Sequence, residues 1–211
     1  MPKNHLHFAD PARESWFMNF KTIVSTALLA PGLLFGIEKP AYETIEKEGK
    51  FEIRKYEAIP VVSAPMDNMG QRDQSFRKLF QYISGANEKK QKIAMTSPVF
   101  MEGKADDKGE NPNGRMSFVV PAAIAKTGTP QPDGEGLKTN EIKGGKVAIL
   151  RFSGWDNEAN RKKAVTDLST FTTAKKLKTR GDAFFAIYDP PWTPEFMRRN
   201  EVWIKLDELN K

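Results

Sequence analysis

The sequence predicts an α+β domain, and three observations lead to this fold class. Segments with alternating apolar and polar residues indicate β-strands, and two segments with apolar residues at helical spacing indicate amphipathic helices. The order strand–helix–strand–strand occurs twice, in residues 41–135 and 136–211. We therefore expect a duplicated β-α-β-β unit with mostly antiparallel, curved sheets and the two helices packed outside. A cleft between the two halves is the expected place for a ligand.

The first unit opens with FEIRKYEAIPVVSA, whose alternation predicts one or two strands over residues 51–64. The next segment predicts a helix from about Gln71 to Gly85, because glycine favours a helix end. Its apolar stripe has the spacing i, i+3, i+4 and i+7 and consists of Phe76, Leu79, Phe80 and Ile83. Two further strands, 92–101 and 115–121, are expected to form a hairpin around a polar loop.

The second unit repeats this order after a linker rich in proline and glycine, residues 130–136. A strand is expected over residues 145–155, and Asn157 is a favourable N-cap for the helix that follows. The apolar side of this helix is formed by Val165, Leu168 and Phe171. The last two strands are expected within residues 182–192 and 200–206.

Composition and charge exclude several kinds of site. The 211 residues include no cysteine, which excludes disulfides, thiolate metal sites and a cysteine nucleophile. The net charge of +6 is a modest excess, and we expect no nucleic-acid partner. The densest basic clusters, residues 161–163 and 175–178, lie on or beside the second helix. Such clusters usually form a solvated helix face, and the alternative is a surface for an anionic partner such as lipid.

The segment before the domain has a different character. Residues 22–37, TIVSTALLAPGLLFGI, carry no charge. As a helix this run would be about 24 Å long, shorter than the ~30 Å core of a bilayer. It suits the apolar region of an export signal, with Lys21 as the positive flank, or a short membrane anchor. A buried or interfacial hairpin and a later start site are the alternatives.

We therefore expect residues 1–40 to be a signal or anchor segment and residues 41–211 to be the folded domain. The domain is then expected to lie outside the cytoplasm, membrane-associated or exported to the periplasmic side, because the positive flank stays inside. We expect residues 22–37 to make the contact with any partner in the membrane. A cytoplasmic location is the alternative.

Several motifs resemble one protein family. They are KIAMTSPV, MSFVVP and YDPPWTPEFMRRNEVWIKL, preceded by the opening YETIEKEGKFEIRKYE. These segments resemble the SOUL/haem-binding protein family, in the family's order, over about residues 41–211. The resemblance implies a distorted β-barrel flanked by two helices. It also implies an apolar surface cleft that binds haem or another porphyrin, both tetrapyrroles.

The resemblance implies a site that includes the first helix. Phe76 and Phe80 match positions where relatives place methionines against the macrocycle, and stacking on the ring would suit them. Packing against the barrel is the alternative for both. Ile83 lies on the same apolar face and is expected to line the cleft. Met95, in the motif KIAMTSPV, is expected either to face the cleft or to fill the core.

The loop with the sequence DPPW is the second part of the implied site. Its prolines restrict the backbone, so we expect a rigid loop. Trp192 and Phe196 are expected either to cover the mouth of the cleft or to plug the end of the barrel, and we favour the mouth.

The expected partners of the porphyrin carboxylates depart from the family's pattern. Relatives use basic residues at positions that fall here on Asp73, Gln81 and Thr193. We expect one of the nearby cations to take this role, because an arginine fork pairs well with a carboxylate. The candidates are Arg72, Arg77 and Lys78 on the helix and Arg198 and Arg199 after the loop. An ordinary exposed face is the alternative for the helix arginines.

No histidine lies within the domain to bind the iron. The two histidines, His5 and His7, precede the apolar run, and two ligands alone make a weak metal site. We therefore expect no metal site at these histidines. Within the domain a methionine, lysine or tyrosine is the alternative iron ligand. Several relatives bind haem without a protein ligand, by burial and carboxylate pairing, and the resemblance leads us to expect the same here.

The sequence favours a binding protein over an enzyme, because no catalytic motif occurs in it. We expect a tetrapyrrole-binding protein that buffers or carries haem. One alternative is a membrane-tethered interaction subunit that keeps the fold but not haem binding. Another is an enzyme that acts on bound haem by iron removal or ring opening, where the cofactor supplies the chemistry.

Overall fold

Nine strands, three helices and two 3-10 turns make up the part of the chain that the computed structural model describes, residues 37–103 and 114–207. The strands are β1 (Tyr42–Glu48), β2 (Phe51–Tyr56), β3 (Ile59–Pro65), β4 (Val99–Glu102), β5 (Arg115–Val119), β6 (Lys138–Ile142), β7 (Gly145–Phe152), β8 (Thr179–Ile187) and β9 (Asn200–Leu206). The helices and turns are α1 (Arg72–Ile83), α2 (Ala122–Thr127), α3 (Glu158–Ala174), η1 (Met69–Gln71) and η2 (Glu195–Met197).

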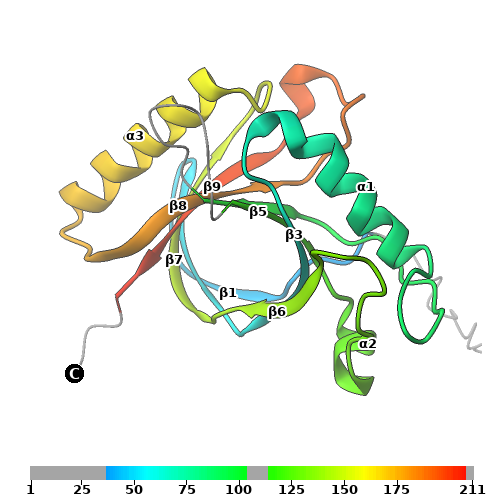
Figure 1. The fold of residues 1–211 in the computed structure, drawn as a ribbon. Helices are drawn as coiled ribbons and strands as arrows, with labels where there is room; N and C mark the ends of the chain where they lie inside the picture. The colour runs from blue at the N-terminus through cyan, green and yellow to red at the C-terminus, as the bar shows by residue number, and fades with distance from the viewer. Residues whose placement is uncertain (1–36, 104–113, 208–211) are drawn as a thin grey trace, which may run out of the picture. The chain divides into compact units, whose positions relative to one another are not determined.

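The strands pair into one antiparallel sheet that curls around a concave face (Figure 1). Their order in the sheet is β1-β2-β7-β9-β8-β4-β5-β3-β6. In the described part of the chain the edge strands β1 and β6 do not pair with each other. The predicted α+β class with antiparallel strands is confirmed. The closed β-barrel is not, because the sheet stays open.

The expected repeat of strand, helix and two strands is present as β3-α1-β4-β5 and β7-α3-β8-β9. Within each unit the strands pair in the same order, β3-β5-β4 and β7-β9-β8. The units meet where β4 pairs with β8, and β6 flanks β3 as β2 flanks β7. The strand order is therefore the same in both directions from the β4–β8 pair, and only β1 lies outside this symmetry.

The two long helices dock on the sheet in the same register. The buried residues of α1 are Ser75, Leu79, Tyr82 and Ile83. Those of α3 have identical spacing and are Ala164, Leu168, Phe171 and Thr172. Because the spacing is the same, each position of α1 has an equivalent in α3. Both helices begin where the sequence predicts, at Arg72 and at Glu158, and Asn157 caps α3 by accepting a hydrogen bond from the amide of Asn160 at 2.9 Å.

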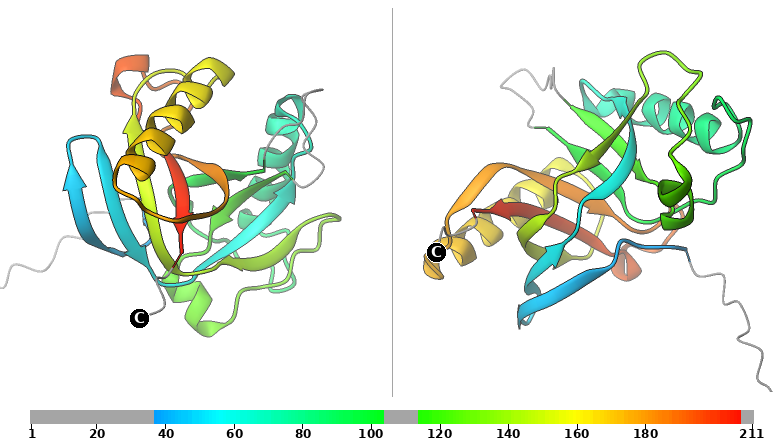
Figure 2. Two further views of the ribbon diagram at one scale, coloured as in Figure 1. Left: turned by 90° about the vertical axis from the view of Figure 1, so that its left-hand side faces the viewer. Right: turned by 90° about the horizontal axis from the view of Figure 1, so that it is seen from below.

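The helices and the concave face bury two separate apolar clusters. One cluster lies between the sheet and the helices, where α1 packs on β3 and β5 and α3 on β7 and β9 (Figures 1 and 2). The other contains strand residues, among them Phe100, Phe184 and Trp203, whose rings contact one another. The sheet is thus buried on both faces over its centre.

Some elements differ from the sequence prediction. The strand expected over 92–101 starts only at Val99, because Thr96 donates its hydroxyl hydrogen bond to the Val119 carbonyl and Pro98 has no N–H for a ladder. The edge strands β1 and β6 and the short α2 are not predicted, because their residues are mostly exposed and show no clear alternation. Most of the loop expected between β4 and β5, and residues 22–36 of the apolar run, lie outside the described residues. No helix of the described segments has the length and apolarity needed to cross a bilayer.

The basic clusters noted in the sequence form ion pairs. Lys175 contacts Glu46 at 2.7 Å and Glu48 at 2.9 Å, and Lys163 contacts Asp167 at 3.1 Å. These exposed pairs support the interpretation of the clusters as a solvated helix face, except at Arg161, whose side chain pairs with the buried Asp156.

A charged network crosses the concave face. The Glu201 side chain on β9 is 0% exposed and accepts two hydrogen bonds of 3.1 Å from the Arg54 guanidinium on β2. It also accepts hydrogen bonds from Tyr188 at 2.9 Å, Trp203 at 2.9 Å and Arg199 at 2.6 Å. Burial alone would raise the pKa of Glu201, but the charge and hydrogen bonds of Arg54, with those of Arg199, outweigh it and hold the pKa below its ordinary value.

We predict that Glu201→Gln destabilises the fold by about 3–5 kcal/mol, because it leaves the Arg54 charge buried without its counter-ion. Urea unfolding would measure the loss, and Lys175→Ala, which removes an exposed pair, should leave the unfolding midpoint nearly unchanged. Because the folded pKa of Glu201 is lowered, its contribution is complete above its unfolded pKa and disappears as the pH falls through the folded value. The wild type should therefore lose more stability than Glu201→Gln on acidification below about pH 4. Equal acid sensitivity of the two proteins would contradict this assignment.

Candidate functional site

Two phenylalanines lie exposed on α1, one helical turn apart. Phe76 is 39% exposed and Phe80 is 52% exposed, although both belong to the predicted apolar stripe. Their rings are nearly parallel, with centroids 6.3 Å apart and 13° between the planes. Phe76 also packs edge-to-face with Phe118 on β5, with ring centroids 5.2 Å apart, which fixes one end of the pair on the sheet. The result is a fixed aromatic surface open to a ligand.

Comparison of α1 with α3 shows that a helix can dock on this sheet without aromatic rings at these two positions. The positions in α3 equivalent to Phe76 and Phe80 are Val165, which is half-buried, and Ser169, which is exposed. The residue that fills the core from this stripe is Leu79, which is fully buried like its equivalent Leu168. The aromatic character of the exposed pair therefore has no counterpart in the packing of α3.

A buried carboxylate joins the starts of the two helices. The Asp156 side chain is 2% exposed and lies just before α3. The Arg72 Nη1 at the start of α1 lies 3.0 Å from its Oδ2, and Arg161 of α3 contacts it with Nε at 2.6 Å and Nη2 at 2.9 Å. Arg77, the other candidate on α1, is exposed to solvent. The predicted cation Arg72 thus lies one turn before Phe76 on the same side of the helix.

The loop between β8 and β9, residues 188–199, is anchored from inside by Arg198. The Arg198 side chain is buried, and its Nε donates to the Thr193 carbonyl at 2.9 Å while Nη2 donates to the Pro191 carbonyl. The guanidinium also lies 4.1 Å from the centre of the Trp155 ring. The structure therefore places Arg198 as a support of the loop, and not at the surface where a ligand carboxylate would meet it.

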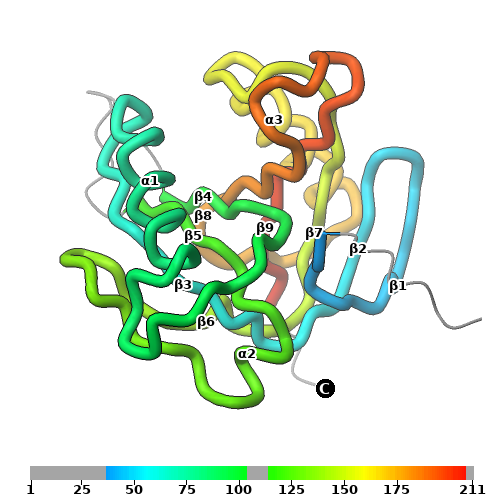
Figure 3. Tube along the Cα trace, turned by 90° about the vertical axis from the view of Figure 1, so that its right-hand side faces the viewer, coloured from blue at the N-terminus to red at the C-terminus, as the bar shows by residue number. Residues whose placement is uncertain are grey.

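The outer side of this loop is strongly apolar. Trp192 and Phe196 are each 81% exposed, and Met197 is also exposed. The loop rises on the side of the sheet that carries the helices (Figure 3) and is tied to the start of α3, because the Gly154 amide donates to the Glu195 carbonyl at 3.2 Å. Both rings remain open to a partner, and their role at a cleft mouth stays a prediction.

The remaining predicted residues lie deeper. Ile83 is buried in the cluster between helix and sheet, and Met95 is half-buried against the same cluster. The structure thus aligns Arg72, Phe76 and Phe80 along one side of α1. Sequence reasoning missed Asp156 as the junction of α1 with α3. Its signal was weak, a lone acid in the sequence GWDN before the N-cap.

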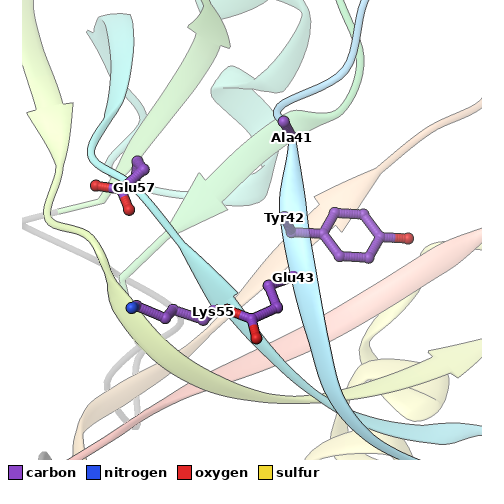
Figure 4. A pocket seen from close by; sticks show the side chains of 5 residues that line it. All are labelled: Ala41, Tyr42, Glu43, Lys55 and Glu57. Carbon is purple, nitrogen blue, oxygen red and sulfur yellow. The ribbon is translucent and has the colours of Figure 1, made fainter.

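The described residues contain no group of three or more histidine, cysteine, aspartate or glutamate side chains that could hold a metal ion. His5 and His7 lie outside them. A hollow of about 250 Å³ lies at the β1–β2 hairpin (Figure 4), lined by Ala41, Tyr42, Glu43, Lys55 and Glu57. This hollow is below the size range of drug-sized ligand pockets and lies at the end of the sheet opposite the strands that carry α1.

The comparison with family models and the comparison with known proteins indicate the same family. The family described as SOUL heme-binding protein matches residues 37–205. The mouse protein named Heme-binding protein 1 is 30% identical over 171 residues, which is 80% of this chain and 86% of the relative. The pig protein of the same name is 27% identical over 184 residues, 81% of this chain and 94% of the relative.

Solved structures share the fold at low identity. The EcmrR C-terminal domain has a TM-score of 0.58 and 10% identity, and the match covers 80% of this chain and 99% of that domain. A protein described as a hydrolase from Listeria innocua has a TM-score of 0.54 and 11% identity, covering 77% of this chain and 94% of that one. At these identities the likeness shows the fold alone.

The anchoring of the loop by Arg198 leads to a prediction. Replacing Arg198 by alanine should speed hydrogen exchange of the Thr193 and Met197 amides about tenfold or more, because a charged hydrogen bond contributes roughly 1.5–3 kcal/mol. Hydrogen-exchange NMR would measure this, with exchange in β7 as the internal control. Protection in the loop that is the same in Arg198→Ala and wild type would show that the prolines alone hold it.

Proposed function

The chain belongs to the SOUL heme-binding protein family, and from this premise we propose that it binds haem or another porphyrin on the aromatic surface of α1. The family membership and the relatives named Heme-binding protein 1 support a haem-binding role. The single observation that carries the choice of site is the exposed pair Phe76 and Phe80. These rings offer a flat apolar surface, which is the surface that a macrocycle needs for stacking.

The chemistry of the neighbouring residues fits this ligand. Arg72 lies one turn from Phe76, and Arg77 is exposed on the same helix, so a cation is within reach of a carboxylate at the edge of a stacked ring. When bound, haem would supply its own iron chemistry, and the chain's residues would hold the ring and exclude water from one face. We place no protein ligand on the iron, because both histidines of the chain precede the domain.

An open surface of this kind suits reversible binding of haem. Most of the free energy of binding would come from apolar contact on one side of the ring, and the other side would stay accessible until Trp192 and Phe196, or a receiving protein, cover it. We therefore propose that the protein buffers or carries haem. Retention without net turnover, when bound haem is incubated with a reductant, would separate this role from an enzyme that opens the ring.

We predict that replacing Phe76 and Phe80 by alanine weakens haem binding more than replacing Arg77. A fully buried apolar side chain contributes roughly 1.5–3 kcal/mol, while an exposed ion pair contributes about 1 kcal/mol or less. The double aromatic variant should therefore bind at least about tenfold more weakly in an absorbance titration, and Arg77→Ala within about fivefold of wild type.

Ile45→Ala is the matched control, because Ile45 has a similar exposure on β1. Replacing both His5 and His7 by alanine should leave the absorbance spectrum of the complex unchanged. A spectrum that collapses in this variant would place the iron ligand in the N-terminal segment. Equal affinity of the aromatic variant and wild type would remove α1 as the binding surface.

We also propose that the apolar run 22–37 brings the protein to a membrane or directs its export. The support is the uncharged sequence of this run and its positive flank, Lys21. After cell fractionation the full chain is expected with membranes or outside the cytoplasm, and a variant with Leu28, Leu29 and Leu33 replaced by aspartate is expected to lose this behaviour. Full-length protein found in the cytoplasm alone would contradict the proposal.

A further inference from the structure

The repeat places two arginines at equivalent positions on one carboxylate. Arg72 lies seven residues before Leu79, the fully buried leucine of α1, and Arg161 lies seven residues before Leu168, the fully buried leucine of α3. Both guanidinium groups contact Asp156, at 3.0 Å from Arg72 and at 2.6 and 2.9 Å from Arg161. The starts of α1 and α3 therefore together hold a pair of arginines on one carboxylate.

The two arginines are held very differently. Arg161 makes both hydrogen bonds of its fork to Asp156, contacts the Met101 sulfur at 2.8 Å and lies 4.5 Å above the Phe185 ring. Arg72 is 33% exposed, and within residues 37–103 and 114–207 its side chain has no ion-pair or hydrogen-bond partner besides Asp156. Arg161 is therefore fixed in place, whereas Arg72 can turn outward by breaking a single contact.

Arg72 also lies in line with the aromatic pair. Positions 72, 76 and 80 follow one another at one helical turn, about 6 Å per step. A planar ring on Phe76 and Phe80 would bring a carboxylate at its edge near Arg72. In this arrangement Asp156 and the ligand carboxylate compete for the guanidinium of Arg72.

We propose that Asp156 is a specificity-determining residue that competes with the ligand for Arg72. The carboxylate of an acidic tetrapyrrole can pair with Arg72 only when Arg72 leaves Asp156. Asp156 therefore weakens the binding of acidic ligands and leaves the binding of neutral ligands unchanged. Arg161 remains on Asp156 during the exchange and prevents the buried carboxylate from losing all its partners. This inference rests on the proposed function, because it concerns the same aromatic surface.

The test uses the full chain and two probes, iron protoporphyrin with free carboxylates and its dimethyl ester. Asp156→Asn keeps the size of the side chain and an oxygen for Arg161, but frees Arg72. It should bind the free acid roughly 2–5-fold more tightly and the ester as wild type does. Arg72→Gln should weaken binding of the acid alone, and the double variant should behave as Arg72→Gln, because the gain needs Arg72.

Arg161→Gln tests the same competition with the opposite sign. It leaves Asp156 to Arg72 alone, so the acid should bind more weakly and the ester unchanged. This variant decides the matter if Asp156→Asn does not fold, and urea unfolding of each variant checks its integrity. Equal effects on acid and ester, or no effect on either, would overturn the role of Asp156 while haem binding stands. Failure of the wild type to bind either probe would overturn the proposed function and this inference with it.

Discussion

The buried carboxylate of Glu201 is the interaction on which the shape of the sheet depends. It joins Arg54 on β2 with Trp203 on β9 and with Tyr188 and Arg199 from the loop between β8 and β9. A buried charge is tolerated only when its partners reach it from several sides, and here one partner comes from β2, which is separated from β9 by β7 in the sheet. This network and the adjoining aromatic rings lie on the concave face, whereas the binding surface that we propose on α1 lies on the other face of the sheet, where the helices pack.

The internal symmetry separates what the fold needs from what a ligand needs. Both helices bury four residues at the same spacing, and both place an arginine on Asp156. The helices differ on their exposed sides, where α1 carries Phe76 and Phe80 and α3 carries Val165 and Ser169. Because α1 and α3 pack on the sheet in the same way, the difference between their exposed residues is evidence that α1 has a role besides packing. The duplicated architecture thus acts as an internal control for the assignment of the site.

The sequence predicts the repeated units and the helix starts, because apolar periodicity, the N-cap Asn157 and helix-ending glycine are local signals. It does not predict β1 or β6, since strands at the sheet edge have few buried residues to reveal their period. The closure of the sheet was expected from the resemblance alone, and strand pairing of this kind depends on contacts far apart in the chain. At the site, the apolar stripe marks Phe76 and Leu79 alike, and only the docking of α1 decides that the first is exposed and the second buried. The roles of Arg198 and Asp156 were also out of reach, because the carbonyls that Arg198 meets depend on the course of its loop, and Asp156 meets Arg72 only when both helices are docked.

Affinity and selectivity come from different parts of this surface. Apolar contact scales with the area removed from water, and the two phenylalanines supply it for any macrocycle, whatever its side groups. An arginine at the rim adds little free energy when it is exposed, but it distinguishes a ring with carboxylates from one without. In this chain the rim arginine, Arg72, already contacts Asp156, so in the proposed site the preference for an acidic ligand depends on how the two carboxylates compete for Arg72. In the site that we propose, the rings hold the ligand and the cations set its orientation and selectivity, so the position of the cations can change while an apolar surface on α1 is kept.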